Sequence, residues 1–225
     1  MFTGAREGSV KTAGVAGLIM VIGIIVLGPV LGGPDALSST AVADYARDLT
    51  GSSFLRMAPA RFGCYALLTA VELVFFAGLW SFARQLAPRT VLAPIVALSG
   101  AAFVAGGMAS DAFSLGQVIA LHAHNGVRPD ANLAVIADLS STVLLIEVNV
   151  CLAVAIAAVC VAAIRTQGLP APLCWFGFVA AAAAVIPGFV PTTEGVFIVS
   201  NLLRLAFVAA LSVVFIRRSA IARSR

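Results

Sequence analysis

Three ionisable side chains, Glu72, Glu147 and Arg204, lie within long apolar runs of the sequence. At bilayer depth each would cost about 2.5–3.5 kcal/mol even on insertion scales, so such side chains usually pair or mark a functional site. Their depth can be counted at about 1.5 Å per helical residue from the basic residue that ends each run. Glu72 then lies about 18 Å from Arg84, and Arg204 about 20 Å from Arg217. The equal depth predicts a Glu72–Arg204 ion pair.

Further polar side chains extend this set toward the outer side of the membrane. Glu147 lies about 27 Å from Arg165, further out than the ion pair. Asn149 falls at the depth of Asn201, and Asn201 shares a helix face with Arg204 because the two lie three positions apart. The hypothesis is an outward polar cavity. Its mouth comprises Asp111, Asp138 and Glu194, its wall Glu147, Asn149 and Asn201, and its floor the Glu72–Arg204 pair.

Two interpretations of these residues stay open. In the first, the cavity binds a small polar or amphipathic ligand, or carries protons through its carboxyl groups, as in a ligand-binding, partner-binding or transport-related protein. In the second, the ion pair is sealed and only orients the helices, because burying both partners together costs far less than burying one. That interpretation predicts a structural or assembly subunit of a membrane complex with a membrane-protein partner.

Sequence motifs favour a protein that is not an enzyme. Lys11, the only lysine, precedes the first apolar run, so no retinal Schiff base can form within the membrane. His122 and His124 lie outside the apolar runs, and even with Asp130 they lack a fixed third ligand, so neither haem nor a metal site is predicted. The sequence contains no G-x-S-x-G, H-E-x-x-H or Walker motif. No cofactor is expected, and a membrane enzyme acting on a lipid-soluble substrate stays as an alternative.

The overall composition sets the class of protein. Of the 225 residues, 61% are hydrophobic and 11% are charged, and the mean hydropathy is +1.06. A soluble domain is about 25% charged, so a water-soluble globule is excluded. The basic residues lie between the apolar runs, where they report membrane orientation rather than nucleic-acid binding.

The apolar runs predict an all-α, polytopic transmembrane helix bundle that forms a single domain over residues 1–225. A helix that crosses the roughly 30 Å hydrocarbon core needs about 20 residues. The six predicted spans are 13–32, 62–83, 90–112, 137–163, 172–190 and 195–216. The first is interpreted as a retained transmembrane helix because its apolar stretch is too long for a signal peptide.

The placement of arginine and lysine predicts that both termini are cytoplasmic, because cytoplasmic loops are enriched in these residues. With that orientation the inner segments carry Arg6, Lys11, Arg84, Arg89, Arg165, Arg217, Arg218, Arg223 and Arg225, and the outer segments carry only Arg47, Arg56, Arg61 and Arg128. The excess of arginine over lysine and the alanine-rich composition suggest a bacterial plasma membrane.

The loops and the small residues predict an outer helix and the places where helices pack closely. Val42, Tyr45, Ala46 and Leu49 recur at helical spacing, which predicts a short outer amphipathic helix over 38–50, with a solvated loop as the alternative. Gly100, Gly106 and Gly107, and the run Ala180–Ala184, predict close helix approach. The four cysteines contain no C-x-x-C pair and are expected as small apolar residues.

Two short motifs resemble those of a known family. Residues 28–35 read G-P-V-L-G-G-P-D, and residues 168–177 read G-L-P-A-P-L-C-W-F-G. They are similar to a G-P-x-L motif followed by P-D, and to an L-P-x-x-L-x-W-x-G motif that begins the fifth span. The family consists of small bacterial six-helix integral membrane proteins that share a domain of unknown function. The resemblance implies a six-helix fold and no particular site.

Overall fold

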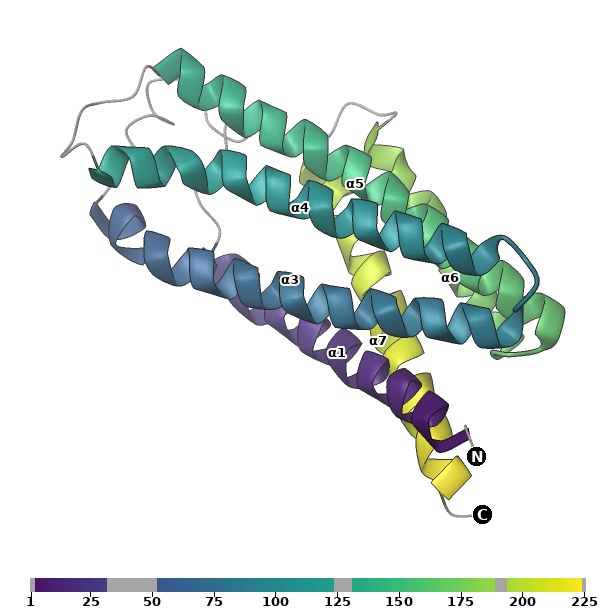
Figure 1. Ribbon diagram of the computed structural model, residues 1–225. Coiled ribbons are helices and arrows are strands. Elements are labelled where there is room, and N and C mark those ends of the chain that lie inside the picture. The colour runs from purple at the N-terminus through teal and green to yellow at the C-terminus, as the bar shows by residue number, and fades with distance from the viewer. Residues whose placement is uncertain (1–2, 32–51, 124–130, 189–193, 224–225) are drawn as a thin grey trace.

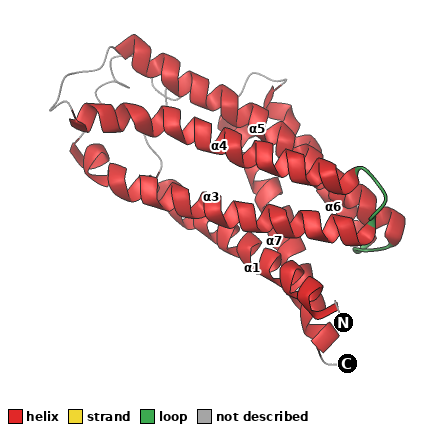
Figure 2. Ribbon diagram, in the orientation of Figure 1, coloured by secondary structure: helices red, strands yellow, loops and turns green. Residues whose placement is uncertain are grey.

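The computed structural model describes residues 3–31, 52–123, 131–188 and 194–223. Within these ranges the chain is helical and contains no strand, which confirms the all-α class (Figure 2). The elements in order are α1 (Thr3–Leu31), α3 (Ser52–Leu86), α4 (Leu92–Ala123), α5 (Ala131–Thr166), α6 (Ala171–Val185), the 3-10 turn η1 (Ile186–Gly188) and α7 (Glu194–Arg223).

Five helices of the described chain are long and apolar enough to cross a membrane. The segments are Gly8–Val26, Gly63–Leu86, Leu92–Phe113, Val135–Thr166 and Ile198–Arg218. The fifth predicted span corresponds to α6, a shorter apolar helix of 15 residues, which is about 22 Å long at 1.5 Å per residue. The count of six spans therefore stays a prediction. The outer helix expected over 38–50 lies outside the described residues.

The helices pack in a ring that follows the order of the chain. Each helix contacts the next, and α7 returns to pack against α1, while α3 also contacts α5 across the ring. Figure 1 shows α1 and α7 side by side, with both chain termini at the same end of the bundle. In this ring α1 stands between α3 and α7, and α6 stands between α5 and α7. Side chains of α3 and α7 still meet inside this ring of helices, where the aromatic ring centroids of Phe82 and Phe215 are 4.8 Å apart.

Large apolar side chains fill the interior, and small residues bring the helices close around them. Phe75, Phe207 and Phe215 are fully buried. A Cβ added at Gly78 would overlap the Cβ of Ala13, so α1 and α3 approach as small-residue packing predicts. The predicted close contacts are confirmed at Gly100 against Phe76 and at Gly106 against Val148, and Ala180, Ala181, Ala183 and Ala184 are buried. Gly107 instead has no atom within 4 Å of an added Cβ.

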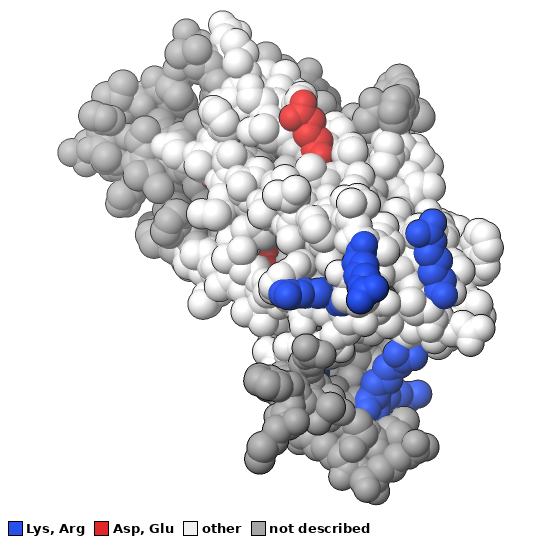
Figure 3. All heavy atoms as spheres, turned by 45° about the vertical axis from the view of Figure 1, so that its right-hand side comes forward, with Lys and Arg blue, Asp and Glu red and all other residues white. Residues whose placement is uncertain are grey.

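Basic side chains gather at one end of the bundle, which we call the basic end (Figure 3). Its exposed residues are Arg84, Arg89, Arg165, Arg217 and Arg218. Trp80 lies one turn from Arg84, whose guanidinium carbon is 5.6 Å from the centre of the indole ring. Trp175, in the first turns of α6, is 65% exposed. Tryptophan beside arginine is typical of a membrane–water interface.

Candidate functional site

The centre of the candidate site is a hydrogen bond between α5 and α7. Arg204 of α7 donates from Nη1 to Oδ1 of Asn149 on α5. Asn149 is 1% exposed and Arg204 is 9% exposed. α6 stands between the two helices, and the length of the arginine side chain lets Arg204 reach past it to Asn149. The structure thus brings together two of the predicted site residues, and we call them the Asn149–Arg204 centre.

The two side chains retain hydrogen-bond donors that no group in the described chain satisfies. Nδ2 of Asn149 and Nε of Arg204 are both buried and have no partner among the described residues. A buried donor left without an acceptor costs about 1–3 kcal/mol, and more when it is charged. Buried polar groups in proteins are therefore nearly always hydrogen-bonded. The centre offers only N–H groups, so an acceptor is what would complete it.

The expected ion pair between Glu72 and Arg204 is not formed within the described residues, which corrects that prediction. Arg204 makes its hydrogen bond to Asn149 and has no carboxylate partner in this part of the chain. Glu72 on α3 is half-buried and lies close to Asp111 of α4, a second carboxyl group, so these two residues form no ion pair. Glu72 lies on the side of α3 that faces α4, whereas Arg204 turns to Asn149 on α5. Equal depth does not bring two side chains together when they lie on helix faces that turn toward different neighbours.

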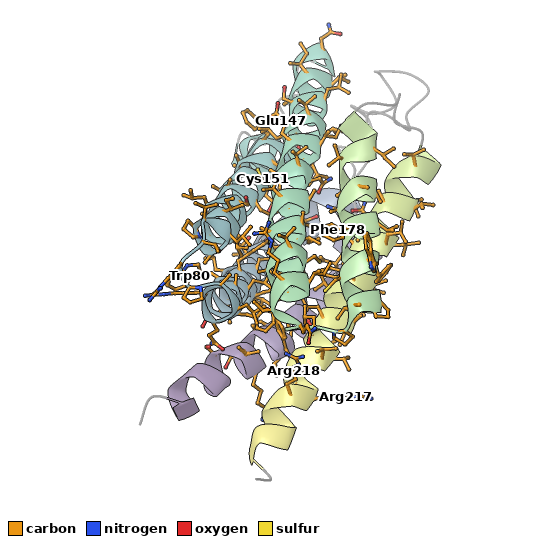
Figure 4. The ribbon with its side chains drawn as sticks, turned by 90° about the vertical axis from the view of Figure 1, so that its right-hand side faces the viewer. Trp80, Glu147, Cys151, Phe178, Arg217 and Arg218 are labelled. Carbon is orange, nitrogen blue, oxygen red and sulfur yellow. The ribbon has the colours of Figure 1, made fainter. Side chains whose placement is uncertain are left out.

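The other predicted site residues lie at different places. Glu147 is exposed, because it is about 200° from Asn149 around the axis of α5. Figure 4 shows Glu147 above Cys151 on α5, on the side away from Phe178 of α6. Asn201 is half-buried on α7, three residues before Arg204. The side chains of Asp138, Glu194, His122, His124 and Asp130 lie outside the described residues.

The position of the centre along the helices separates it from the basic end. Counted along α7, Arg204 is about 20 Å from Arg217, and Asn149 is about 24 Å from Arg165 along α5. One turn from the centre toward the basic end, both helices present buried apolar side chains. These are Leu152 and Ala153 on α5, and Phe207 and Val208 on α7. We call these four residues the apolar floor of the centre.

A second polar contact on α5 was missed by sequence reasoning. Ser110 of α4 and Ser141 of α5 are buried, and their hydroxyl oxygens are 2.7 Å apart. Each hydroxyl also lies 3.1 Å from the backbone oxygen of the other residue. We call this the Ser110–Ser141 clamp. Serine is common in membrane helices, so neither residue stood out before the packing of α4 on α5 was known.

The cysteines fit their expected role as small buried residues only in part. Cys160 on α5 and Cys174 on α6 are fully buried, and their side chains lie close to each other. Cys64 and Cys151 are half-buried. Among the described residues, no group of three or more His, Cys, Asp or Glu side chains could hold a metal ion.

The geometry defines the class of protein: a helical bundle with several apolar helices that can cross a membrane and a buried polar centre among them. No protein-family model, curated protein or solved structure matches this chain. The resemblance to six-helix membrane proteins therefore stays a prediction.

Proposed function

We propose that this chain is a multi-pass membrane protein whose Asn149–Arg204 centre binds a small polar or amphipathic ligand, as a binding or transport protein rather than an enzyme. The membrane is a bacterial plasma membrane, α6 is the fifth of six spans, and both termini are cytoplasmic. The basic end and its tryptophans support this orientation, because arginine and lysine accumulate on the cytoplasmic side.

The observation that carries the proposal is the pair of buried donors without partners, Nε of Arg204 and Nδ2 of Asn149. A contact that served only to hold helices together would use all of its polar atoms, as the Ser110–Ser141 clamp does. A buried charge without a partner is strongly destabilising, by about 3–5 kcal/mol when one member of an ion pair is removed. A ligand that supplies the acceptor gives the chain a reason to keep this arrangement.

The ligand reaches the centre from the side opposite the basic end. Toward the basic end the way is filled by the apolar floor, in which Phe207 is 1% exposed and Val208 is 2% exposed. Toward the other end, α7 continues with Asn201, a half-buried amide three residues from Arg204. Because residues three apart lie on nearly the same helix face, Asn201 lies on the path to Arg204.

The test is thiol labelling of intact cells with a membrane-impermeant maleimide. In a variant without native cysteines, Asn201→Cys is compared with Val208→Cys on the same helix. Maleimide reacts with the thiolate, and thiolate forms where water reaches. Rapid labelling at position 201 and none at position 208 is the expected result. A cysteine placed in 38–50 serves as the surface control. If this control reacts and position 201 does not, the interior is sealed and the chain is a structural or assembly subunit.

A further inference from the structure

We infer that the ligand of the Asn149–Arg204 centre is a monocarboxylate, gripped side-on by the Nε and Nη2 edge of Arg204. This inference rests on the proposed function and names the chemistry of its ligand. It follows from four features of the centre: the free edge of the guanidinium, the single buried charge, the orientation of the Asn149 amide and the apolar floor.

The hydrogen bond to Asn149 occupies one particular nitrogen of Arg204. In a guanidinium, Nη1 lies on the side of Cδ, whereas the N–H bonds of Nε and Nη2 point in parallel along one edge. That edge forms the two-pronged grip that matches the two oxygens of a carboxylate. Arg204 uses Nη1 toward Asn149, and its Nε has no partner within the described chain. The contact therefore holds the arginine in place while leaving Nε, one of the two prongs of this edge, without an acceptor.

The charge of the centre selects an anion with a single negative charge. Arg204 is 9% exposed and pairs with no carboxylate in the part of the chain that the structure describes. In a buried site the attraction between unlike charges is strong, and an unbalanced charge is costly. One negative charge balances the guanidinium, whereas a dianion would leave an excess of negative charge in the same place. A carboxylate is a planar monoanion whose two oxygens match the edge of the guanidinium, and unlike nitrate or bicarbonate it can carry a nonpolar substituent.

The amide of Asn149 and the apolar floor set the rest of the ligand. Because Oδ1 already accepts from Arg204, the group left over is Nδ2, which can only donate. The ligand must therefore present acceptors on this side as well. The apolar floor, one turn away, offers only hydrocarbon. The ligand is thus a carboxylate that carries a nonpolar substituent.

Such a carboxylate can come from water or from the bilayer, and one experiment distinguishes the two sources. The full chain, purified in an uncharged detergent, is heated in the presence of sodium butyrate or sodium octanoate at constant ionic strength. We expect a saturable rise in the melting temperature, since a ligand that binds only the folded state stabilises it. A response to butyrate assigns the aqueous source, and a response to octanoate alone assigns the bilayer. Butyramide, which has the same shape without the charge, should give no rise.

Three variants test whether the carboxylate binds at the Asn149–Arg204 centre. Arg204→Lys keeps the charge but loses the two-pronged edge, and should weaken binding by at least about tenfold. Asn149→Asp places a carboxylate beside Arg204 from within the chain, and should abolish the response to butyrate or octanoate while raising the melting temperature of the ligand-free protein. This second variant keeps the test decisive if Arg204→Lys fails to fold. Arg84→Gln at the basic end removes a positive charge away from the centre and should leave the response unchanged.

Several results would overturn the inference. An equal rise with butyramide, an unaltered affinity in Arg204→Lys, or a loss of the response in Arg84→Gln would each exclude side-on carboxylate binding at this centre. Sulfate or phosphate acting in place of the carboxylates would do the same. If position 201 is labelled in cells and no carboxylate stabilises the protein, the ligand is not a carboxylate and the proposed function stands. If position 201 is sealed and no carboxylate stabilises the protein, both fail together.

Discussion

Two buried polar contacts on α5 differ in how completely they are satisfied. Ser141 and Ser110 exchange hydroxyl hydrogen bonds and reach the backbone oxygens of each other. Asn149, about 12 Å further along the same helix, accepts one hydrogen bond from Arg204, and each of the two keeps a buried donor without a partner in the described chain. The first contact is neutral and reciprocal, and the second is charged and incomplete.

The difference distinguishes a contact that holds helices together from one that can bind a ligand. In a membrane, hydrogen bonds between helices contribute about 0.6 kcal/mol on average, and up to about 1.7 kcal/mol, to stability. The Ser110–Ser141 clamp can supply such a contribution because none of its parts needs anything further. The Asn149–Arg204 centre adds a charge that must be balanced, so it is a poor device for stability alone. The predictions below change one contact or its surroundings, and the difference between the two contacts should decide each outcome.

The largest effect is expected when the centre is made apolar. The double variant Asn149→Leu/Arg204→Met removes the charge and both unsatisfied donors together, so no polar atom is left alone. Replacing buried ionic groups by apolar ones often stabilises by about 1–4 kcal/mol. We expect a higher free energy of unfolding in detergent, measured by denaturant titration, and no response to carboxylates. A large loss of stability would instead show that the centre holds the bundle together as the clamp does.

The next effect is expected at Gly177 of α6, the helix that stands between α5 and α7. A Cβ added there would overlap Sγ of Cys160 and lie 2.7 Å from Cε2 of Phe207. Overpacking of this kind typically costs about 1–3 kcal/mol. Gly177→Ala should lower the melting temperature and weaken carboxylate binding, because it pushes apart the helices that carry Asn149 and Arg204.

Gly107→Ala is the matched control for this variant. No atom lies within 4 Å of a Cβ added at Gly107, so the substitution should leave binding unchanged and the melting temperature unchanged or slightly higher, because alanine is more favourable than glycine inside a helix. If Gly177→Ala destabilises the bundle but leaves the ligand affinity intact, α6 does not set the geometry of the centre.

A smaller effect is expected at the clamp. Ser110→Ala leaves Ser141 without its hydroxyl partner and should destabilise by up to about 1.7 kcal/mol. A double-mutant cycle with Ser141→Ala measures the coupling between the two residues. The response to carboxylates should stay as in the unaltered protein, because the clamp contributes no group to the centre. Loss of that response in Ser110→Ala would mean that the two contacts on α5 are not independent.

The sequence located the long apolar helices and included both residues of the centre among its candidates, but it did not predict that Asn149 and Arg204 pair. Apolar length locates each long helix, because the bilayer thickness sets that length. The free-energy cost of placing a charge within the membrane singles out Arg204, and the depth counted along the helices places Asn149 level with Asn201. Depth says nothing about which neighbour a side chain faces, so Glu72 was assigned to Arg204 although Glu72 lies beside Asp111 of α4 and Arg204 contacts Asn149 of α5.

The packing of neighbouring helices also explains the contacts that the sequence did not reveal. The Ser110–Ser141 clamp and the Cys160–Cys174 contact both depend on the angle at which a helix presents each side chain to its neighbour. Glu147 was placed with Asn149 along the wall of one cavity, yet two positions along a helix are about 200° apart, and Glu147 is exposed on the opposite side of α5. The spacing of two residues along a helix fixes the faces on which they lie. Only the packing of the helices shows what each face contacts.

The smallest effect is expected at the basic end, distant from both contacts on α5. Arg84 lies 5.6 Å from the ring centre of Trp80, and an exposed cation–π contact contributes about 0.5–1 kcal/mol. Trp80→Leu keeps an apolar side chain at the position and should lower the free energy of unfolding by no more than that amount. Carboxylate binding should be unchanged, because the apolar floor separates the centre from the basic end. Weaker binding in Trp80→Leu would show that the basic end and the Asn149–Arg204 centre are coupled, and the ligand path would then have to run through the apolar floor.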